Sequence, residues 1–72
     1  MPTLTDTIHL RLAEAIRQSG LTQKELAAMV DVNQSQISCY LHARKMPALD
    51  TLAKLCKALD VDANYILCQD LL

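Results

Sequence analysis

The 72-residue chain is long enough for one small domain and too short for an enzyme domain with a second, regulatory one. Hydrophobic residues make up 51% of it, but aromatic residues only 3%, with no Trp or Phe. A core of Leu, Ile, Val, Ala and Met suits helices better than sheets. The net charge of −1 argues mildly against a nucleic-acid partner, since DNA-binding proteins usually carry a surplus of basic residues. We therefore expect residues 1–72 to form a single all-α domain.

The N-terminal residues contain no basic stretch leading into an apolar run, and no apolar run reaches 18 residues. We therefore expect a protein that does not enter a membrane and resides in the cytoplasm. Three cysteines, Cys39, Cys56 and Cys68, fit no zinc or disulfide spacing, which agrees with a reducing compartment. His9 and His42 have no partner at metal spacing, so we expect surface histidines, no metal and no cofactor. Cys56 and Cys68 are expected to be core or near-core thiols.

The first predicted helix runs from about Thr7 to Ser19, with Thr5 or Asp6 as its N-cap and Gly20 as its stop. Its apolar stripe has helical spacing and consists of Ile8, Leu12, Ala15 and Ile16.

Thr22 and Glu25 form the pattern of a capping box, which predicts a second helix at about 23–30. Asn33, with Gln36 three residues later, repeats this pattern and predicts a third helix at about 34–42. Only about three residues separate the two helices. The spacing of Ile37, Tyr40 and Leu41 turns these side chains to the core and leaves an outward face of Gln34, Ser35, Ser38 and Cys39.

Pro47 ends any continuation of the third helix, and the segment before it is basic. A fourth helix follows, with an apolar stripe of Leu49, Leu52, Leu55, Cys56 and Leu59. Asp62 is then expected to cap a short fifth helix from about Ala63 to Leu67.

Three segments taken together resemble the Cro and phage-repressor, or Xre-type, helix-turn-helix family: Gly20 to Ala27, Val32 to Ser38 and Arg44 to Pro47. The resemblance covers nearly the whole chain and continues through Leu52, Leu55, Leu59, Val61, Ile66 and Leu67. It implies a five-helix, lambda-repressor-like DNA-binding domain whose third helix reads an operator in double-stranded DNA. It also implies a homodimer, a role in bacterial or phage transcription regulation, usually as a repressor, and localisation to the nucleoid when bound to DNA.

The resemblance assigns base reading to the outward face of the third helix, namely Gln34, Ser35, Ser38 and Cys39. It places contacts to the DNA backbone or flanking bases at Gln23, Asn33, Gln36, Arg44 and Lys45. At two of these positions, Gln34 and Gln23, the chemistry of the residue or of its place in the helix supports the assignment. A Gln amide can bond both N6 and N7 of adenine, and the start of a helix, where Gln23 lies, attracts phosphate. No Asp or Glu occurs between Val32 and Leu49, so this region can be positive although the whole chain is not.

Four departures from the family pattern concern two of its turns, one of its ion pairs and one position on the outward face of the third helix. Asp31 and Asp60 stand where the family commonly has Gly. Ile16 and Leu41 are apolar where many members pair an Arg with a Glu, a substitution that packed cores tolerate. Cys39 replaces a larger polar residue, and it is the one cysteine that we regard as a candidate redox sensor.

No paired carboxylates, catalytic triad or glycine-rich phosphate loop is visible, so we expect no enzyme activity. Two functions therefore remain. The first is an operator-binding regulator, either on its own or as the DNA-binding half of an antitoxin. The second is a protein-interaction module with the same fold, which the acidic balance favours. An apolar C-terminal edge of Ile66, Leu67, Leu71 and Leu72 is the expected dimer contact.

Overall fold

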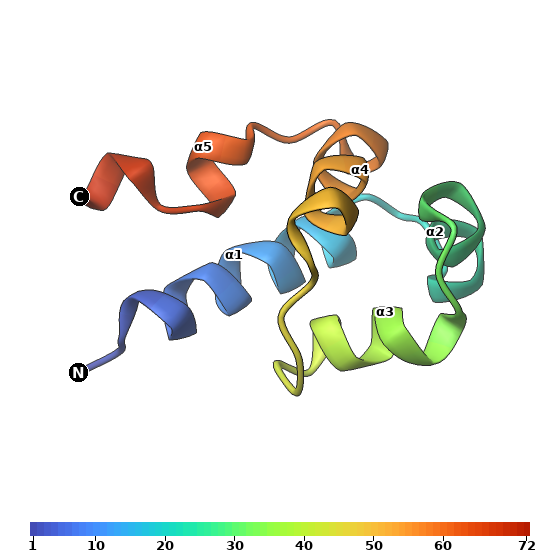
Figure 1. The fold of residues 1–72 in the computed structure, drawn as a ribbon, viewed down its shortest axis with the longest axis horizontal. Coiled ribbons are helices and arrows are strands. Elements are labelled where there is room, and N and C mark those ends of the chain that lie inside the picture. Colours follow the sequence, from blue (N-terminus) through green and yellow to red (C-terminus); the bar gives the residue numbers. More distant parts are fainter.

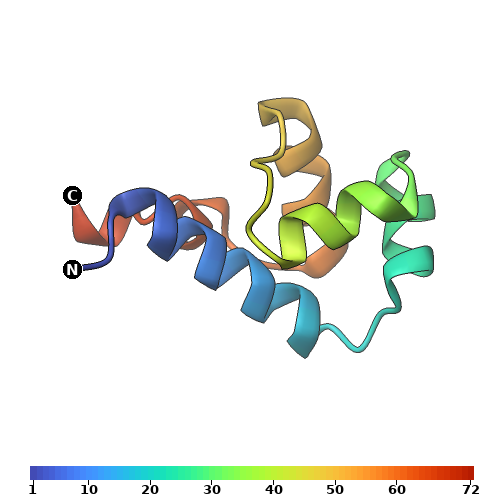
Figure 2. The same cartoon turned by 90° about the horizontal axis from the view of Figure 1, so that it is seen from below.

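The computed structural model describes residues 1–72 and confirms the expected all-helical fold of five α-helices. Figure 1 shows α1, the longest helix, running diagonally beneath α4 and α5, with α2 and α3 at one end. Both chain ends lie on the side away from α2 in both views (Figures 1 and 2). No helix is long and apolar enough to cross a membrane. The elements are α1 (Leu4–Gln18), α2 (Gln23–Val30), α3 (Gln34–Leu41), α4 (Leu49–Leu59), α5 (Ala63–Ile66) and a 3-10 turn (Gln69–Leu71).

The first helix begins three residues earlier than predicted, and its N-cap is neither Thr5 nor Asp6 but Thr3. The Asp6 amide donates to the Thr3 hydroxyl at 3.1 Å, and the Thr3 amide donates to the Asp6 carboxylate at 3.0 Å. These hydrogen bonds lower the pKa of Asp6. Such a reciprocal pair satisfies two backbone donors at once, the amides of Thr3 and Asp6. With a cap at Thr5 or Asp6 instead, these amides would have only water as a hydrogen-bond partner.

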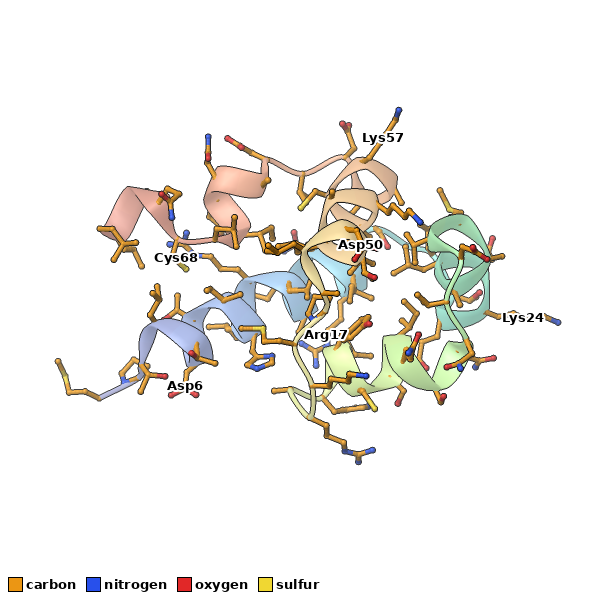
Figure 3. All side chains as sticks on the ribbon, in the orientation of Figure 1. Asp6, Arg17, Lys24, Asp50, Lys57 and Cys68 are labelled. Atoms are coloured by element: carbon orange, nitrogen blue, oxygen red, sulfur yellow. The ribbon has the colours of Figure 1, made fainter.

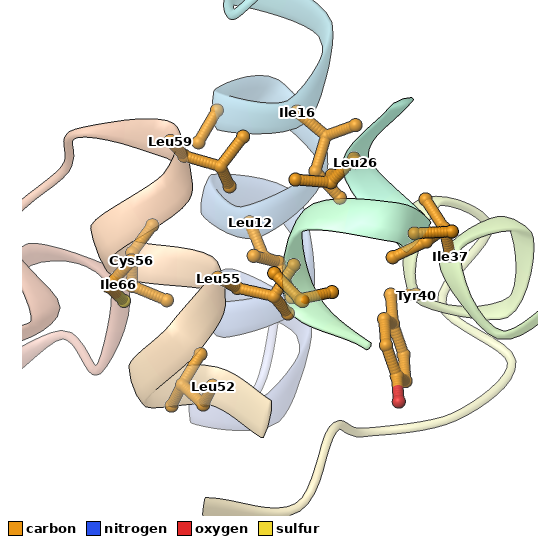
Figure 4. Close-up of a cluster of buried hydrophobic side chains, with 13 residues drawn as sticks. Leu12, Ile16, Leu26, Ile37, Tyr40, Leu52, Leu55, Cys56, Leu59 and Ile66 are labelled. Carbon is orange, nitrogen blue, oxygen red and sulfur yellow. The ribbon is translucent and has the colours of Figure 1, made fainter. Parts of the chain in front are cut away.

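Thirteen buried side chains form one core between α1, α2, α3, α4 and α5 (Figure 4). Both apolar replacements of the family's ion pair take part, because Ile16 is buried in the core and Leu41 packs against it. Tyr40 is the core's only aromatic residue. The members are Leu12, Ala15, Ile16, Leu26, Ala27, Val30, Ile37, Tyr40, Leu52, Leu55, Cys56, Leu59 and Ile66.

Two apolar residues lie elsewhere than predicted. Leu49 was expected in the buried stripe of α4 but is 81% exposed, because the first turn of α4 extends past the packed core. It borders an open apolar cavity of about 170 Å³ that also touches Ile8 and Leu67. Ile66 was expected on an exposed C-terminal edge but is completely buried, because α5 folds back onto α1. Leu71 and Leu72 are exposed.

Arg11 holds the C-terminal segment against α1, a contact that the sequence pattern did not indicate. Its guanidinium donates two hydrogen bonds to the Asp70 carboxylate and one, at 2.7 Å, to the Tyr65 carbonyl oxygen. It also lies over the Tyr65 ring, 4.2 Å from the ring centre. The bond from Arg11 lowers the pKa of Asp70. Arg11 thus joins α1 to residues more than 50 positions away in the chain.

The helices α2, α3 and α4 end in the same way, with a residue in the left-handed conformation. Asp31, Ala43 and Asp60 occupy these positions with φ values of 58°, 58° and 54°. At the end of α3 the Arg44 amide donates to the Cys39 carbonyl oxygen at 2.9 Å, and the Ala43 amide donates to the Tyr40 carbonyl oxygen at 3.3 Å. This is the bonding pattern of a Schellman motif, whose left-handed residue is normally Gly. Asp tolerates the conformation better than Ala does.

We predict that Ala43→Gly raises the free energy of unfolding by about 0.5–1 kcal/mol, because Gly relieves the left-handed strain of a residue with a Cβ. Urea denaturation followed by circular dichroism measures the change. Ala53→Gly is the matched control: Ala53 is also exposed but lies inside α4, so this substitution should destabilise the protein by about 0.5–1 kcal/mol. Equal effects of the two substitutions would contradict the strain at Ala43.

Candidate nucleic-acid interface

The helices α2 and α3 contain eight residues each, and three residues, Asp31 to Asn33, connect them. They pack on one another, while α4 supports α2 and α1 supports α3. The Val32 amide donates to the Ala27 carbonyl oxygen at 3.1 Å and closes the end of α2. Figure 2 shows α3 running from its start beside α2 toward α1, near which it ends. The burial of one face of α3 therefore leaves the opposite face turned outward, exposed in its first turn and half-buried in the next.

The four residues assigned to base reading share this free face. Gln34 and Ser35 are exposed in its first turn, and Ser38 and Cys39 are half-buried one turn later. Their positions i, i+1, i+4 and i+5 lie on one side of a helix, opposite the buried Ile37 and Tyr40. The structure thus brings all four together on one face.

Asn33 caps the start of α3, as the sequence predicts. Its side-chain oxygen accepts a hydrogen bond from the Gln36 amide at 3.1 Å and another from the Ser35 hydroxyl at 2.7 Å. The expected capping box is only half present, because the Gln36 side chain makes no return bond to the Asn33 amide. Gln36 is half-buried, and its side-chain amide is not used in the cap.

Gln23 occupies the first position of α2, where backbone amides lack partners within the helix. The predicted capping box is complete here: the Glu25 amide donates to the Thr22 hydroxyl, and the Thr22 amide donates to the Glu25 carboxylate, both at 3.0 Å. These bonds lower the pKa of Glu25. Sequence reasoning overlooked Lys24, which extends into solvent from the same turn (Figure 3). Its place directly after Gln23 in a capped first turn is the signal that could have identified it.

Arg44 and Lys45 follow the Schellman ending of α3, and both are exposed. The bond from the Arg44 amide to Cys39 fixes the backbone at the point where the chain leaves the helix. From Val32 to Leu49 the chain carries no acidic residue, so no carboxylate of this segment neutralises the two cations. Arg44 and Lys45 thus place two positive charges just beyond the end of α3.

The histidines and cysteines form no metal cluster. His9, expected at the surface, is half-buried, and its Nδ1 atom is enclosed without a hydrogen-bond partner, because α3 and its following loop pack beside this part of α1. His42 is exposed. Cys56 and Cys68 are buried free thiols, as predicted, and burial raises the pKa of Cys56. Cys39 is half-buried and also free.

The chain resembles known proteins in both family pattern and sequence. A family model described as helix-turn-helix matches residues 12–66. The HTH-type transcriptional regulator ImmR of Bacillus subtilis (strain 168) is 37% identical over 60 residues, which is 83% of this chain and 47% of that protein. The chain thus spans about half the length of this curated relative. No solved structure matches it significantly. Because the family match includes α2, the turn and α3 in full, the chain belongs to the helix-turn-helix family of Cro and phage-repressor type.

Proposed function

We propose that this chain is a sequence-specific, double-stranded DNA-binding module of a bacterial or phage transcription regulator, acting as a repressor. The observation that carries the proposal is the capped α3, which presents an outward face of small polar side chains and is followed by exposed cations. A helix of this kind fits the major groove with its N-terminal residues toward the bases. The relative's description as a transcriptional regulator supports the same role. The module binds and does not catalyse.

Base reading is proposed for the free face of α3. Gln34 lies first on this face and is exposed, so its amide can pair with N6 and N7 of an adenine. Ser35, Ser38 and Cys39 are short and allow the helix to approach the base edges closely.

Contacts to the backbone are proposed at both ends of the motif. The first turn of α2 offers free amides and a positive dipole to a phosphate beside Gln23. Asn33 and Gln36 border the reading face, and Arg44 and Lys45 add cations beyond the end of α3. Such contacts give affinity and position the helix, whereas base contacts give sequence preference.

A homodimer is proposed as the binding unit. Leu71 and Leu72 are exposed at the C-terminal end, and Leu49 is exposed beside the apolar cavity that Leu67 also lines. Covering these apolar side chains with a second copy removes them from water. The two recognition helices would then meet half-sites about 34 Å apart.

A protein-interaction module with the same fold, such as the part of an antitoxin component that docks a protein instead of DNA, is the second candidate. The net charge of −1 favours it, since most DNA-binding domains are basic. The two candidate functions predict a different dependence of binding affinity on salt concentration. DNA binding releases counterions and weakens steeply with salt, by a slope of about −0.9 in log affinity per phosphate contact.

Random-sequence selection on the purified protein should enrich an inverted repeat, with an affinity that falls as salt increases. Sedimentation of the complex with this DNA should give two chains per duplex. A single half-site bound by one chain would contradict the dimer. No enrichment, from a protein whose circular dichroism is helical, would contradict DNA reading and favour the protein-interaction module.

Gln34→Ala should remove about 1–3 kcal/mol of discrimination at one base pair, because the bidentate contact is lost. Affinities for the selected DNA and for its single-base variants measure this. Gln18→Ala is the control, since Gln18 is also an exposed helical Gln but lies on α1. An unchanged base preference for Gln34→Ala would show that the reading face is placed wrongly.

Arg44→Ala should weaken binding to all sequences alike and reduce the magnitude of the salt slope by about one. Lys57→Ala removes the same charge at the edge of the molecule opposite α3 (Figure 3) and should change neither quantity. Titrations of selected and unrelated DNA at several salt concentrations measure both the affinity and the salt slope. A loss restricted to one sequence would count against a phosphate contact at Arg44.

A further inference from the structure

The hydrogen bonds at the start of α3 determine which way the Asn33 carboxamide points. A backbone N–H can only donate, so the Asn33 atom that lies 3.1 Å from the Gln36 amide must be its oxygen. The Ser35 hydroxyl lies 2.7 Å from the same oxygen. The Asn33 NH₂ group is therefore turned away from the helix, and it extends from an exposed residue.

The bond between Ser35 and Asn33 also fixes what the Ser35 hydroxyl can offer. A hydroxyl has one proton, and an amide oxygen cannot donate, so this proton lies between Ser35 and Asn33. While that bond exists, Ser35 presents only lone pairs to its surroundings. Ser35 therefore offers no donor of its own to a ligand, and its hydroxyl proton serves only to hold the Asn33 side chain.

We propose that Ser35 is a positioning residue that holds the Asn33 amide group as a fixed hydrogen-bond donor to an acceptor atom of the DNA. This inference rests on the proposed function and gives Asn33 a defined role within it. The acceptor is a phosphate oxygen or an acceptor on a base edge, since both bind an amide N–H in the same way. Ser35 itself can meet a base only as an acceptor, for example from N6 of adenine or N4 of cytosine.

The energetic advantage of this arrangement is preorganisation. An exposed Asn side chain can rotate, and binding must then restrict this rotation. Two hydrogen bonds to one oxygen restrict it before DNA arrives. Because Gln36 contributes its backbone amide, only Ser35 adds a bond that a substitution can remove without altering the cap.

Ser35→Ala tests the positioning role. Ala favours the helix more than Ser does, so the variant should unfold at the same or a higher temperature than the unmodified protein. Its affinity for the selected DNA should nevertheless fall about two- to tenfold, the value of one hydrogen bond. Ser35→Thr retains the hydroxyl and should restore the affinity. A structural role alone would instead move stability and affinity together.

Two substitutions of Asn33 test the donor. Asn33→Gly removes the amide group without adding charge, and Gly is tolerated at an N-cap with little loss of stability. Asn33→Asp keeps a strong cap but replaces the donor with an acceptor. Both should bind the selected DNA less tightly, and Asn33→Asp should bind it least. Asn64→Asp is the control for added charge, since Asn64 is exposed on α5.

The double substitution separates positioning from independent contacts. In the Asn33→Gly background Ser35→Ala should cost less affinity than it does in the unmodified protein, because no amide remains to be positioned. Additive losses would overturn the proposal, as would unchanged binding by folded Asn33→Gly. A uniform loss across sequences identifies a phosphate acceptor, and a loss at one base pair identifies a base acceptor. If the unmodified protein binds no DNA, the proposed function fails; if it binds and the variants match it, only this inference fails.

Discussion

A helix of eight residues does not persist alone in water, and both α2 and α3 have this length. Their conformation therefore depends on the burial of one face of each against α1 and α4. Leu26 and Val30 from α2, and Ile37 and Tyr40 from α3, are all nearly or fully buried. Buried and outward side chains lie on opposite sides of the same helix. The core that stabilises α3 therefore also determines which of its side chains face solvent.

The interactions that depend on neighbouring residues were largely predictable from the sequence. Thr22 and Asn33 cap their helices as expected, because an N-cap needs only a polar side chain and an amide two or three residues later. The start of α1 was placed wrongly for the same local reason: Thr3, Thr5 and Asp6 all have capping side chains, and only the reciprocal pair between Thr3 and Asp6 decides among them.

Features that join distant parts of the chain could not be read in this way. Arg11 and Asp70 are 59 positions apart, and no spacing rule relates them. The exposure of Leu49 and the burial of Ile66 depend on where α4 and α5 pack, not on their own periodicity. For the candidate interface, periodicity identified the face of α3 but not the bond between Ser35 and Asn33. Ala43 gave no signal, because Ala is not a residue that favours the left-handed conformation.

The position of the two chain ends has a consequence for how such a module can be combined with others. Both ends lie on the side away from α2 and from the Asn33 end of α3 (Figures 1 and 2). A fluorescent protein, a dye or a surface tether attached at either end would leave that part of the molecule unobstructed. In evolutionary terms, gene fusion can exchange whatever is attached at this side while α2 and α3 are retained. The architecture therefore allows an attached segment and the helix-turn-helix to change separately.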